Sequence, residues 1–362
     1  MLDQVVAAFE RKDYQTARIL LEKLRIESPE NPWVELYFGR LQEVSHQSEV
    51  AEKIYRQLLR LTTHTKIISQ ARQGLQRLEK VKQEEKQRAI AQATATSDNN
   101  EVGILILEPI DHQLKTKAAR DFAEIMQVDV YTARIILPSQ TWRVYRLGRV
   151  GELAFYTTQL QQAGIPCFWL KISQIQQIQV FHVKHLTANS SQIKAVCQNE
   201  ANQIGTMTFN LSEISARVIG LLPIFEQVID INVRGKLERK DKTQDYAQFC
   251  DLHLPKRQSI LRIYDQGYEF QRSLESKTLA HQNTIRINWN NLMNWVNQQL
   301  PQAKLWSEFK TFASTVIDQT ETLNQIPSHI NLFRREDSNW DTAFHLYSGI
   351  IFHKMQGINL DT

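Results

Sequence analysis

The sequence has little glycine and none of the glycine-rich motifs of nucleotide-binding enzymes. Glycine occurs 12 times in 362 residues, about half its usual share. No G-x-G-x-x-G, G-x-S-x-G or H-E-x-x-H pattern is present, so the common dinucleotide, hydrolase and zinc-protease signatures are missing. We therefore expect no enzymatic activity and no cofactor, with an enzyme of unrecognised type as an alternative.

Cysteine is also scarce, and long apolar runs are missing. Cys167, Cys197 and Cys250 are isolated, without C-x-x-C spacing, as in a reducing compartment. The first residues lack a basic segment followed by an apolar one, so no secretory signal is predicted. The longest apolar runs, 104–107 and 218–225, are far shorter than the roughly 18 residues of a spanning helix. A cytoplasmic location without a transmembrane segment is expected.

No excess of one charge dominates the chain. Lys and Arg number 43 and Asp and Glu 39, for a net charge of +4, so the bulk charge does not indicate nucleic-acid binding. The densest charged run contains five cations: Arg234, Lys236, Arg239, Lys240 and Lys242. It is interpreted as a solvated hairpin loop or as a patch for an acidic partner or phosphate backbone.

The first 65 residues contain a repeat. Three pairs of residues lie 34 positions apart: Ala17 and Ala51, Leu21 and Tyr55, Leu24 and Leu58. Each set has a small residue followed by bulky ones at i+4 and i+7, which is one face of a helix. Pro29 and Pro32 lie between the copies, where one helix ends and another begins. This pattern resembles the tetratricopeptide repeat, with a generic pair of helical hairpins as the alternative.

The resemblance implies two antiparallel helices per repeat, over about 1–31 and 32–65, and a capping helix to residue 92. In that family the first helix of each repeat lines a groove that binds a partner. The implied partner-binding residues are Trp33, Leu36, Arg40, Gln70 and Arg77. An aromatic side chain beside arginine is typical of interface anchors.

A small, polar segment at 93–101 is predicted to be a linker, followed by an α+β domain over 102–174. Strands are expected at 102–107, 142–147 and 165–172, and helices at 115–126, 129–137 and 152–163. This βααβαβ order resembles the fold shared by the ribosomal-stalk C-terminal domain and a Clp-protease adaptor. Arg120 and Arg134 keep the basic character of the stalk helices, but Ala123 and Tyr131 do not. The resemblance therefore implies the fold and not the activity.

The rest of the chain changes from strands to helices. Six strand-length runs are expected at 179–185, 193–198, 205–210, 216–222, 246–254 and 259–270. They predict a strand-rich domain over 175–272, an antiparallel sheet or small barrel. Helical patterns at 290–300, 304–319 and 341–354 predict a helical C-terminal region over 273–362. The fold class is therefore multidomain: an all-α repeat followed by α+β.

Three histidine-containing pairs are candidate metal sites: His182 and His185, Asp251 and His253, and His345 and His353. An offset of three on a strand sends two side chains to opposite faces. Two helical turns separate side chains by about 12 Å. Asp251 and His253 share a face but lack a third ligand. No metal site is predicted.

Taken together, these patterns predict a non-enzymatic adaptor or assembly factor that binds protein partners through the helical-repeat groove. The alternative is a nucleic-acid or ribosome-associated factor that uses Arg120, Arg134 and the cations of 234–242. Which partner would bind, and in which process, does not follow from the sequence.

Overall fold

The computed structural model of the chain describes all residues except 97, 190–191, 232–236, 273–283, 333–337 and 358–362, and describes no side chains for 188–189, 226–231 and 237–242. The contacts divide the chain into two compact units, Met1–Gln92 and Ala93–Thr362. The first is helical. The second is α+β, and each is described separately below.

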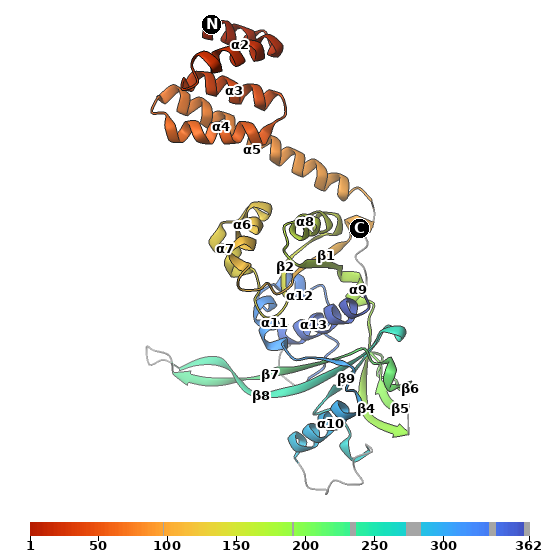
Figure 1. Cartoon of the computed structure of the whole chain (residues 1–362). Helices are drawn as coiled ribbons and strands as arrows, with labels where there is room; N and C mark the ends of the chain where they lie inside the picture. Colours follow the sequence, from red (N-terminus) through yellow and green to blue (C-terminus); the bar gives the residue numbers. More distant parts are fainter. Residues whose placement is uncertain (97, 190–191, 232–236, 273–283, 333–337, 358–362) are drawn as a thin grey trace. The chain divides into compact units, whose positions relative to one another are not determined.

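The helical unit confirms the prediction of a helical N-terminal region. Its helices are α1 (Leu2–Glu10), α2 (Tyr14–Glu27), α3 (Pro32–Val44), α4 (Ser48–Leu61) and α5 (Thr65–Ala93) (Figure 1). Side chains cap two of them: Asp13 accepts a hydrogen bond from the Thr16 backbone and Asn31 accepts one from the Trp33 backbone. Pro32 follows Asn31 as the first helical residue, where its fixed φ is compatible with a helix.

Tyr55 of α4 joins three helices in the core of this unit. Its ring lies between two glycines, Gly39 of α3 and Gly74 of α5, where an added Cβ would lie 2.9 Å and 2.6 Å from ring carbons. Its hydroxyl donates to Glu43 at 2.7 Å, and Glu43 also accepts from Arg77 of α5 at 2.6 Å. Both glycines therefore permit a close helix–helix approach that a larger residue would prevent.

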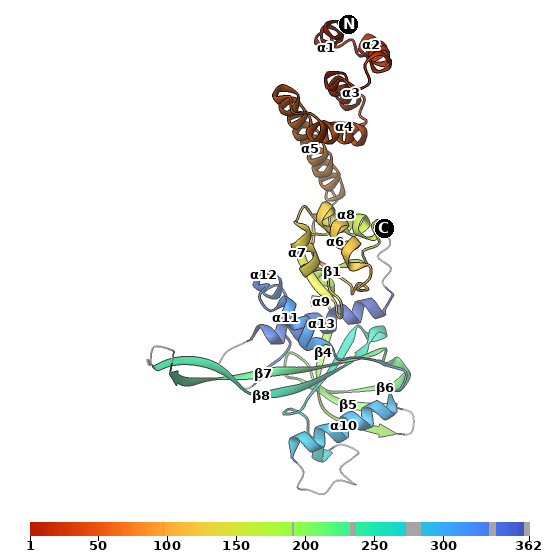
Figure 2. The same cartoon turned by 60° about the vertical axis from the view of Figure 1, so that its left-hand side comes forward.

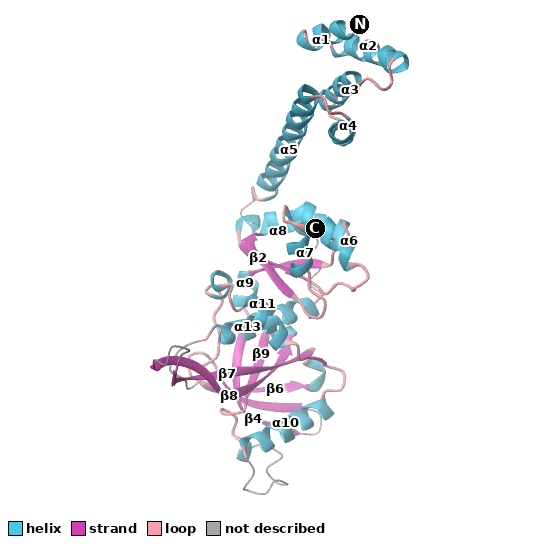
Figure 3. Cartoon of the chain, turned by 90° about the vertical axis from the view of Figure 1, so that its left-hand side faces the viewer, coloured by secondary structure: helices cyan, strands magenta, loops and turns pink. Residues whose placement is uncertain are grey.

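The second unit begins with a three-stranded sheet whose elements follow the expected βααβαβ order. They are β1 (Val102–Leu107), α6 (Lys115–Met126), α7 (Val130–Ile136), β2 (Arg143–Arg149), α8 (Val150–Gln162) and β3 (Cys167–Lys171), and a short helix α9 (Ile172–Gln176) follows. The strand order is β2-β1-β3, and both pairings are antiparallel. Helices α6, α7 and α8 cover one face of this sheet (Figure 3).

Residues 93–101, predicted to be a linker, are part of the second unit in the structure. Asn99 donates to the Ala93 carbonyl at 2.8 Å, and Glu101 accepts from Ser173 and pairs with Lys171 at 2.9 and 3.2 Å. A Cβ on Gly151 would lie 2.6 Å from the Ala93 carbonyl carbon, so the chain passes directly over this glycine. Apolar patterns in the sequence do not reveal polar contacts of this kind.

The larger sheet has seven strands and is mixed. Its strands are β4 (Gln179–Asn189), β5 (Gln192–Gln198), β6 (Ile204–Asn210), β7 (Ala216–Ile231), β8 (Leu237–Leu254), β9 (Ser259–Tyr264) and β10 (Lys304–Trp306). The order is β10-β7-β8-β9-β4-β5-β6, with β4 parallel to β9 and β10 parallel to β7. The prediction of a purely antiparallel sheet or a barrel is therefore wrong. Strands β7 and β8 continue as a two-stranded ribbon beyond their neighbours (Figure 2).

The C-terminal helices are α10 (Ile285–Gln299), α11 (Phe309–Val316), α12 (Thr320–Leu323) and α13 (Asn339–Met355). The helix predicted over 304–319 is wrong in its first part, because Lys304–Trp306 pairs with the start of β7 as β10. Residues 304–306 are too few to carry a periodic pattern of their own. Their conformation is decided by the open edge of β7, which lies far away in the sequence.

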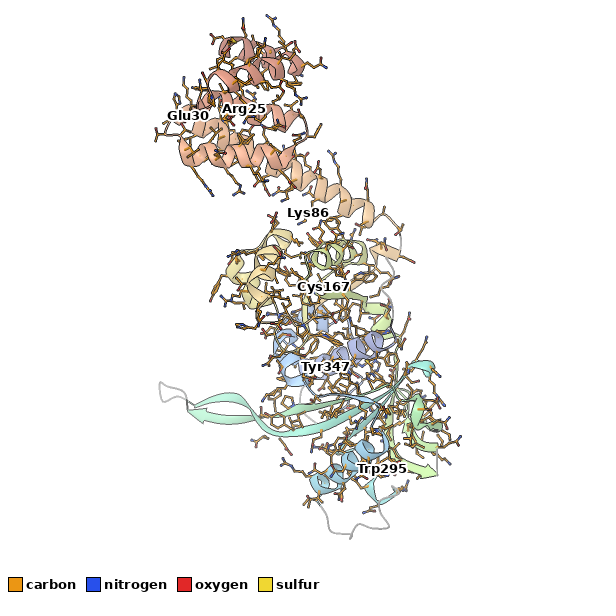
Figure 4. All side chains as sticks on the ribbon, in the orientation of Figure 1. Arg25, Glu30, Lys86, Cys167, Trp295 and Tyr347 are labelled. Carbon is orange, nitrogen blue, oxygen red and sulfur yellow. The ribbon has the colours of Figure 1, made fainter. Side chains whose placement is uncertain are left out.

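The two sheets share one core. Helices α11 and α13 lie between them (Figures 1 and 3), and a single apolar cluster joins side chains of β1, β2, β3, β7, β8, α11 and α13. Helix α10 covers the other face of the larger sheet with a second cluster. Figure 4 labels one residue of each layer, Tyr347 on α13 and Trp295 on α10. Residues 102–174, 175–272 and 273–362 therefore contribute to one compact unit.

Candidate functional site

The five residues predicted to line the repeat groove do not form one open surface. Leu36 is 3% exposed and belongs to the apolar core of the helical unit, so it cannot contact a partner and its assignment is corrected. Trp33 is half-buried against the same core, with its ring 5.3 Å from the ring of His64. These two side chains hold helices together.

The polar members of the predicted set are exposed, but two have intramolecular partners. The Arg40 guanidinium lies 5.7 Å from the centre of the Phe9 ring. Arg77 forms two hydrogen bonds with Glu43, at 2.6 and 2.8 Å, and this pairing raises the pKa of Arg77. Gln70 is exposed. The charge of Arg77 is therefore already neutralised within the protein.

A different surface of the helical unit is hollowed. A groove of about 460 Å³ lies between α4 and α5. Leu75, Leu78 and Val81 of α5 contribute its apolar side chains, and Val81 is 43% exposed. These residues continue the buried stripe of Ile67, Ala71 and Gly74 along the same helix. The apolar residues of this stripe recur every three or four positions, which is visible in the sequence. The predicted groove, however, was placed on the first helices of the repeats.

The border of this α4/α5 groove is mainly acidic. The charged side chains that line it are Glu49, Glu52, Arg56, Glu79, Lys82 and Glu85. Arg56 pairs with Glu52 at 2.7 Å, which leaves an excess of carboxylates along the border. An apolar floor between acidic margins is complementary to an amphipathic helix with basic flanks.

The predicted cationic patch is not a loop in the part that is described. Arg234 and Lys236 lie outside the described residues. Arg239, Lys240 and Lys242 lie on β8, where their backbones pair with β7, and their side chains are outside the described set. The interpretation as a hairpin loop is therefore corrected for these three residues, and the phosphate-binding interpretation stays a prediction.

Asp251 and His253, interpreted as an ordinary strand pair, belong to a buried polar cluster built from three elements. Asp251 of β8 forms a bidentate ion pair with Arg262 of β9, at 2.8 and 2.9 Å. Ser348 of α13 donates to Asp251 at 2.7 Å and lies 2.9 Å from Nε2 of His253. His345 of α13 lies 3.4 Å from Arg262. All five side chains are fully buried.

This cluster is arranged for structure rather than for nucleophilic catalysis. A serine–histidine–carboxylate triad needs the carboxylate on the histidine and an accessible hydroxyl, whereas here Asp251 binds the Ser348 hydroxyl and solvent is excluded. Burial lowers the pKa of His253 to about 4 and that of His345 well below its usual range. Both imidazoles are therefore neutral near pH 7. Residues so far apart in sequence offered no local signal.

The opposite-face argument for His182 and His185 holds only for an unbroken strand and is wrong here, because β4 has a bulge between Val183 and His185. Their cross-strand partners, Gln198 and Val196, are two residues apart and therefore lie on one face. His182 lines a cavity, and His185 lies 3.6 Å from Glu269. His353 approaches the Gln174 carbonyl at 3.1 Å, whereas His345 lies 3.4 Å from Arg262. Within the described ranges no group of three or more His, Cys, Asp or Glu side chains could hold a metal ion. The expectation of a metal-free protein stays a prediction.

Comparison with known proteins adds no family to this description. No family model, curated protein or solved structure matches the chain. Among the described residues, no helix combines the length and the apolar composition required to cross a bilayer.

Proposed function

We propose that the protein is a non-enzymatic adaptor or assembly factor, and that its helical unit binds a basic amphipathic helix of a protein partner in the α4/α5 groove. The observation that carries this proposal is the groove itself, with exposed Val81 in an apolar floor and acidic margins. The 34-residue spacing and the five helices support an interpretation as two tetratricopeptide-like repeats with a long final helix.

The position of the groove at the end of the helical stack favours a helix as its occupant. In a stack of helical hairpins each helix pair buries its apolar face against the next pair. Here the stack of the helical unit ends with α5, whose apolar stripe continues to Val81. A partner helix placed in the groove would contact α4 and α5 as a further helix of the stack would, and it would bury Leu75 and Val81.

The test is binding of a synthetic amphipathic helix to the full-length protein, measured by fluorescence anisotropy. The probe has a leucine face flanked by lysines, and a second peptide replaces the lysines with glutamates. We expect the basic peptide to bind more tightly than the acidic one. Added salt should weaken binding of the basic peptide. Glu49→Lys combined with Glu85→Lys is expected to reduce its affinity roughly tenfold, through loss of attraction and added repulsion.

A control double variant changes two residues of the groove predicted from the sequence. Arg40→Glu with Gln70→Glu changes two exposed residues and is expected to leave peptide binding unchanged. The opposite result would reject the α4/α5 groove: peptide affinity lost with Arg40→Glu and Gln70→Glu, and unchanged with Glu49→Lys and Glu85→Lys. Equal binding of the acidic and basic peptides would do the same. If partners that co-purify with the protein dissociate after nuclease treatment, the nucleic-acid alternative would be supported instead.

A further inference from the structure

A second cavity, in the α+β unit, is not used by the proposed adaptor function. It has a volume of about 460 Å³, within the usual range for small-molecule sites. Strand β4 contributes His182 and Lys184, the turn between β5 and β6 contributes Glu200 and Asn202, and the segment after α12 contributes His329. We call it the β4 cavity.

The wall of the β4 cavity is connected to the buried polar cluster. Asp251, Arg262, His182 and Gln198 are consecutive register partners across β8, β9, β4 and β5, so their side chains form one row on the sheet. Arg262 also donates to the carbonyls of Ser328 and His329, at 3.0 and 3.1 Å. The buried ion pair thus holds the segment that carries His329.

Three positions in the same wall have irregular backbone geometry. Asn202 and His329 have positive φ values of 60° and 50°, in the left-handed region that Asn and His enter more often than most residues other than glycine. Lys184 is the extra residue of a β-bulge between Val183 and His185. Bulges are over-represented next to functional sites, where they re-aim a side chain, and Lys184, Asn202 and His329 all line the β4 cavity.

One lysine, Lys184, and one carboxylate, Glu200, line the β4 cavity. Lys184 makes no salt bridge with any residue whose placement is described. Glu200 opposes it, but this carboxylate pairs with His329 at 2.6 Å and its side chain is 64% exposed to water. Burial and the charges of Arg262, His329 and Lys184 disfavour protonation of His182, and Asp251 favours it. An anion placed beside His182 would therefore meet a neutral imidazole and the ammonium group of Lys184.

We propose that the β4 cavity binds a small polar molecule through a carboxylate or phosphate group, held by Lys184 and His182. The amides of Gln198, Asn199 and Asn331, which also line the cavity, would contact the uncharged part of the molecule. Carboxylate and phosphate share the feature that matters, oxygen atoms with negative charge that accept charge-assisted hydrogen bonds.

The test is titration of the full-length protein with inorganic phosphate, succinate and glucose at constant ionic strength, followed by NMR of the histidine ring protons. His182→Asn identifies the relevant signal. We expect phosphate or succinate to bind, and glucose to bind at least tenfold more weakly. The pKa of His182, lowered to about 4 by burial and by Arg262, should rise when an anion binds, because a negative charge favours the imidazolium.

Matched variants separate the site from nonspecific anion binding. Lys184→Met is expected to weaken anion binding about tenfold, the effect of losing one charged hydrogen bond. Asn331→Asp, an exposed and nearly isosteric change, should weaken it through repulsion. Lys194→Met removes an exposed lysine of β5 that does not line the cavity and should have no effect. Equal loss in Lys194→Met, unchanged binding in Lys184→Met, or failure of both anions to move the His182 signal would overturn the proposal.

Discussion

The packing of Tyr55 between two glycines yields a prediction in which two effects of one substitution oppose each other. Gly74→Ala in α5 improves helix propensity by about 1 kcal/mol. The added Cβ, however, would lie 2.6 Å from Cζ of Tyr55. The ring cannot move away freely, because Gly39 closes its other side and Glu43 holds its hydroxyl.

The magnitude follows from comparing the two terms. Overpacking a confined site costs about 1–3 kcal/mol, and the rigid surroundings of Tyr55 place this case in the upper part of that range. After subtraction of the propensity gain, we expect Gly74→Ala to destabilise the helical unit by about 1–2 kcal/mol. The equilibrium for opening this unit would then shift roughly 5- to 30-fold.

Hydrogen exchange of the full-length protein measures this shift locally, because peptides from residues 32–78 report on the helical unit alone. A double-mutant cycle supplies the control. In a Tyr55→Leu background the aromatic ring is gone, so Gly74→Ala should become stabilising by about 0.5–1 kcal/mol through propensity. If Gly74→Ala stabilised the unit in both backgrounds, the argument that these glycines serve the close approach of Tyr55 would be refuted.

Three further outcomes concern the α+β unit. Asp251→Asn should destabilise it by about 3–5 kcal/mol in urea denaturation, because the buried Arg262 guanidinium loses its charge partner; an effect below 1 kcal/mol would show that the pair is not needed. The pKa of His253 is lowered in the folded state to about 4, so the unfolded chain binds more protons between pH 6.5 and 4. Stability from this residue is therefore present above pH 6.5 and is lost as the pH falls through that window, and His253→Gln should flatten the measured pH dependence. Cys250 is 1% exposed, and burial raises its pKa to about 12, so it should react with a thiol reagent at pH 8 only after unfolding; rapid labelling of native protein would contradict this.

Local patterns determined much of the secondary structure. The first strand and first helix of the α+β unit, Val102–Leu107 and Lys115–Met126, have the bounds that their apolar patterns and end signals indicate. The next helix, expected over 129–137, begins at Val130 after its N-cap Asp129. Such elements are readable because their burial repeats with the period of the backbone, two in a strand and 3.6 in a helix. In the helical unit, the 34-residue spacing predicted the helices but not which face is hollowed.

Contacts between distant residues decided the rest. The mixed sheet arises because β4 lies parallel to β9, some 80 residues later, and no local pattern specifies that neighbour. The same pairing places His182 beside Arg262 and builds the row of side chains that leads to the β4 cavity. Asp251 and His253 were visible in the sequence as a same-face pair, whereas Arg262, His345 and Ser348 join them only through the packing of α13 on the sheet. Burial of charge in a fold depends on partners that tertiary structure brings together. The sequence therefore singled out Asp251, His253 and His345, but not Arg262, Ser348 or the cluster that all five form.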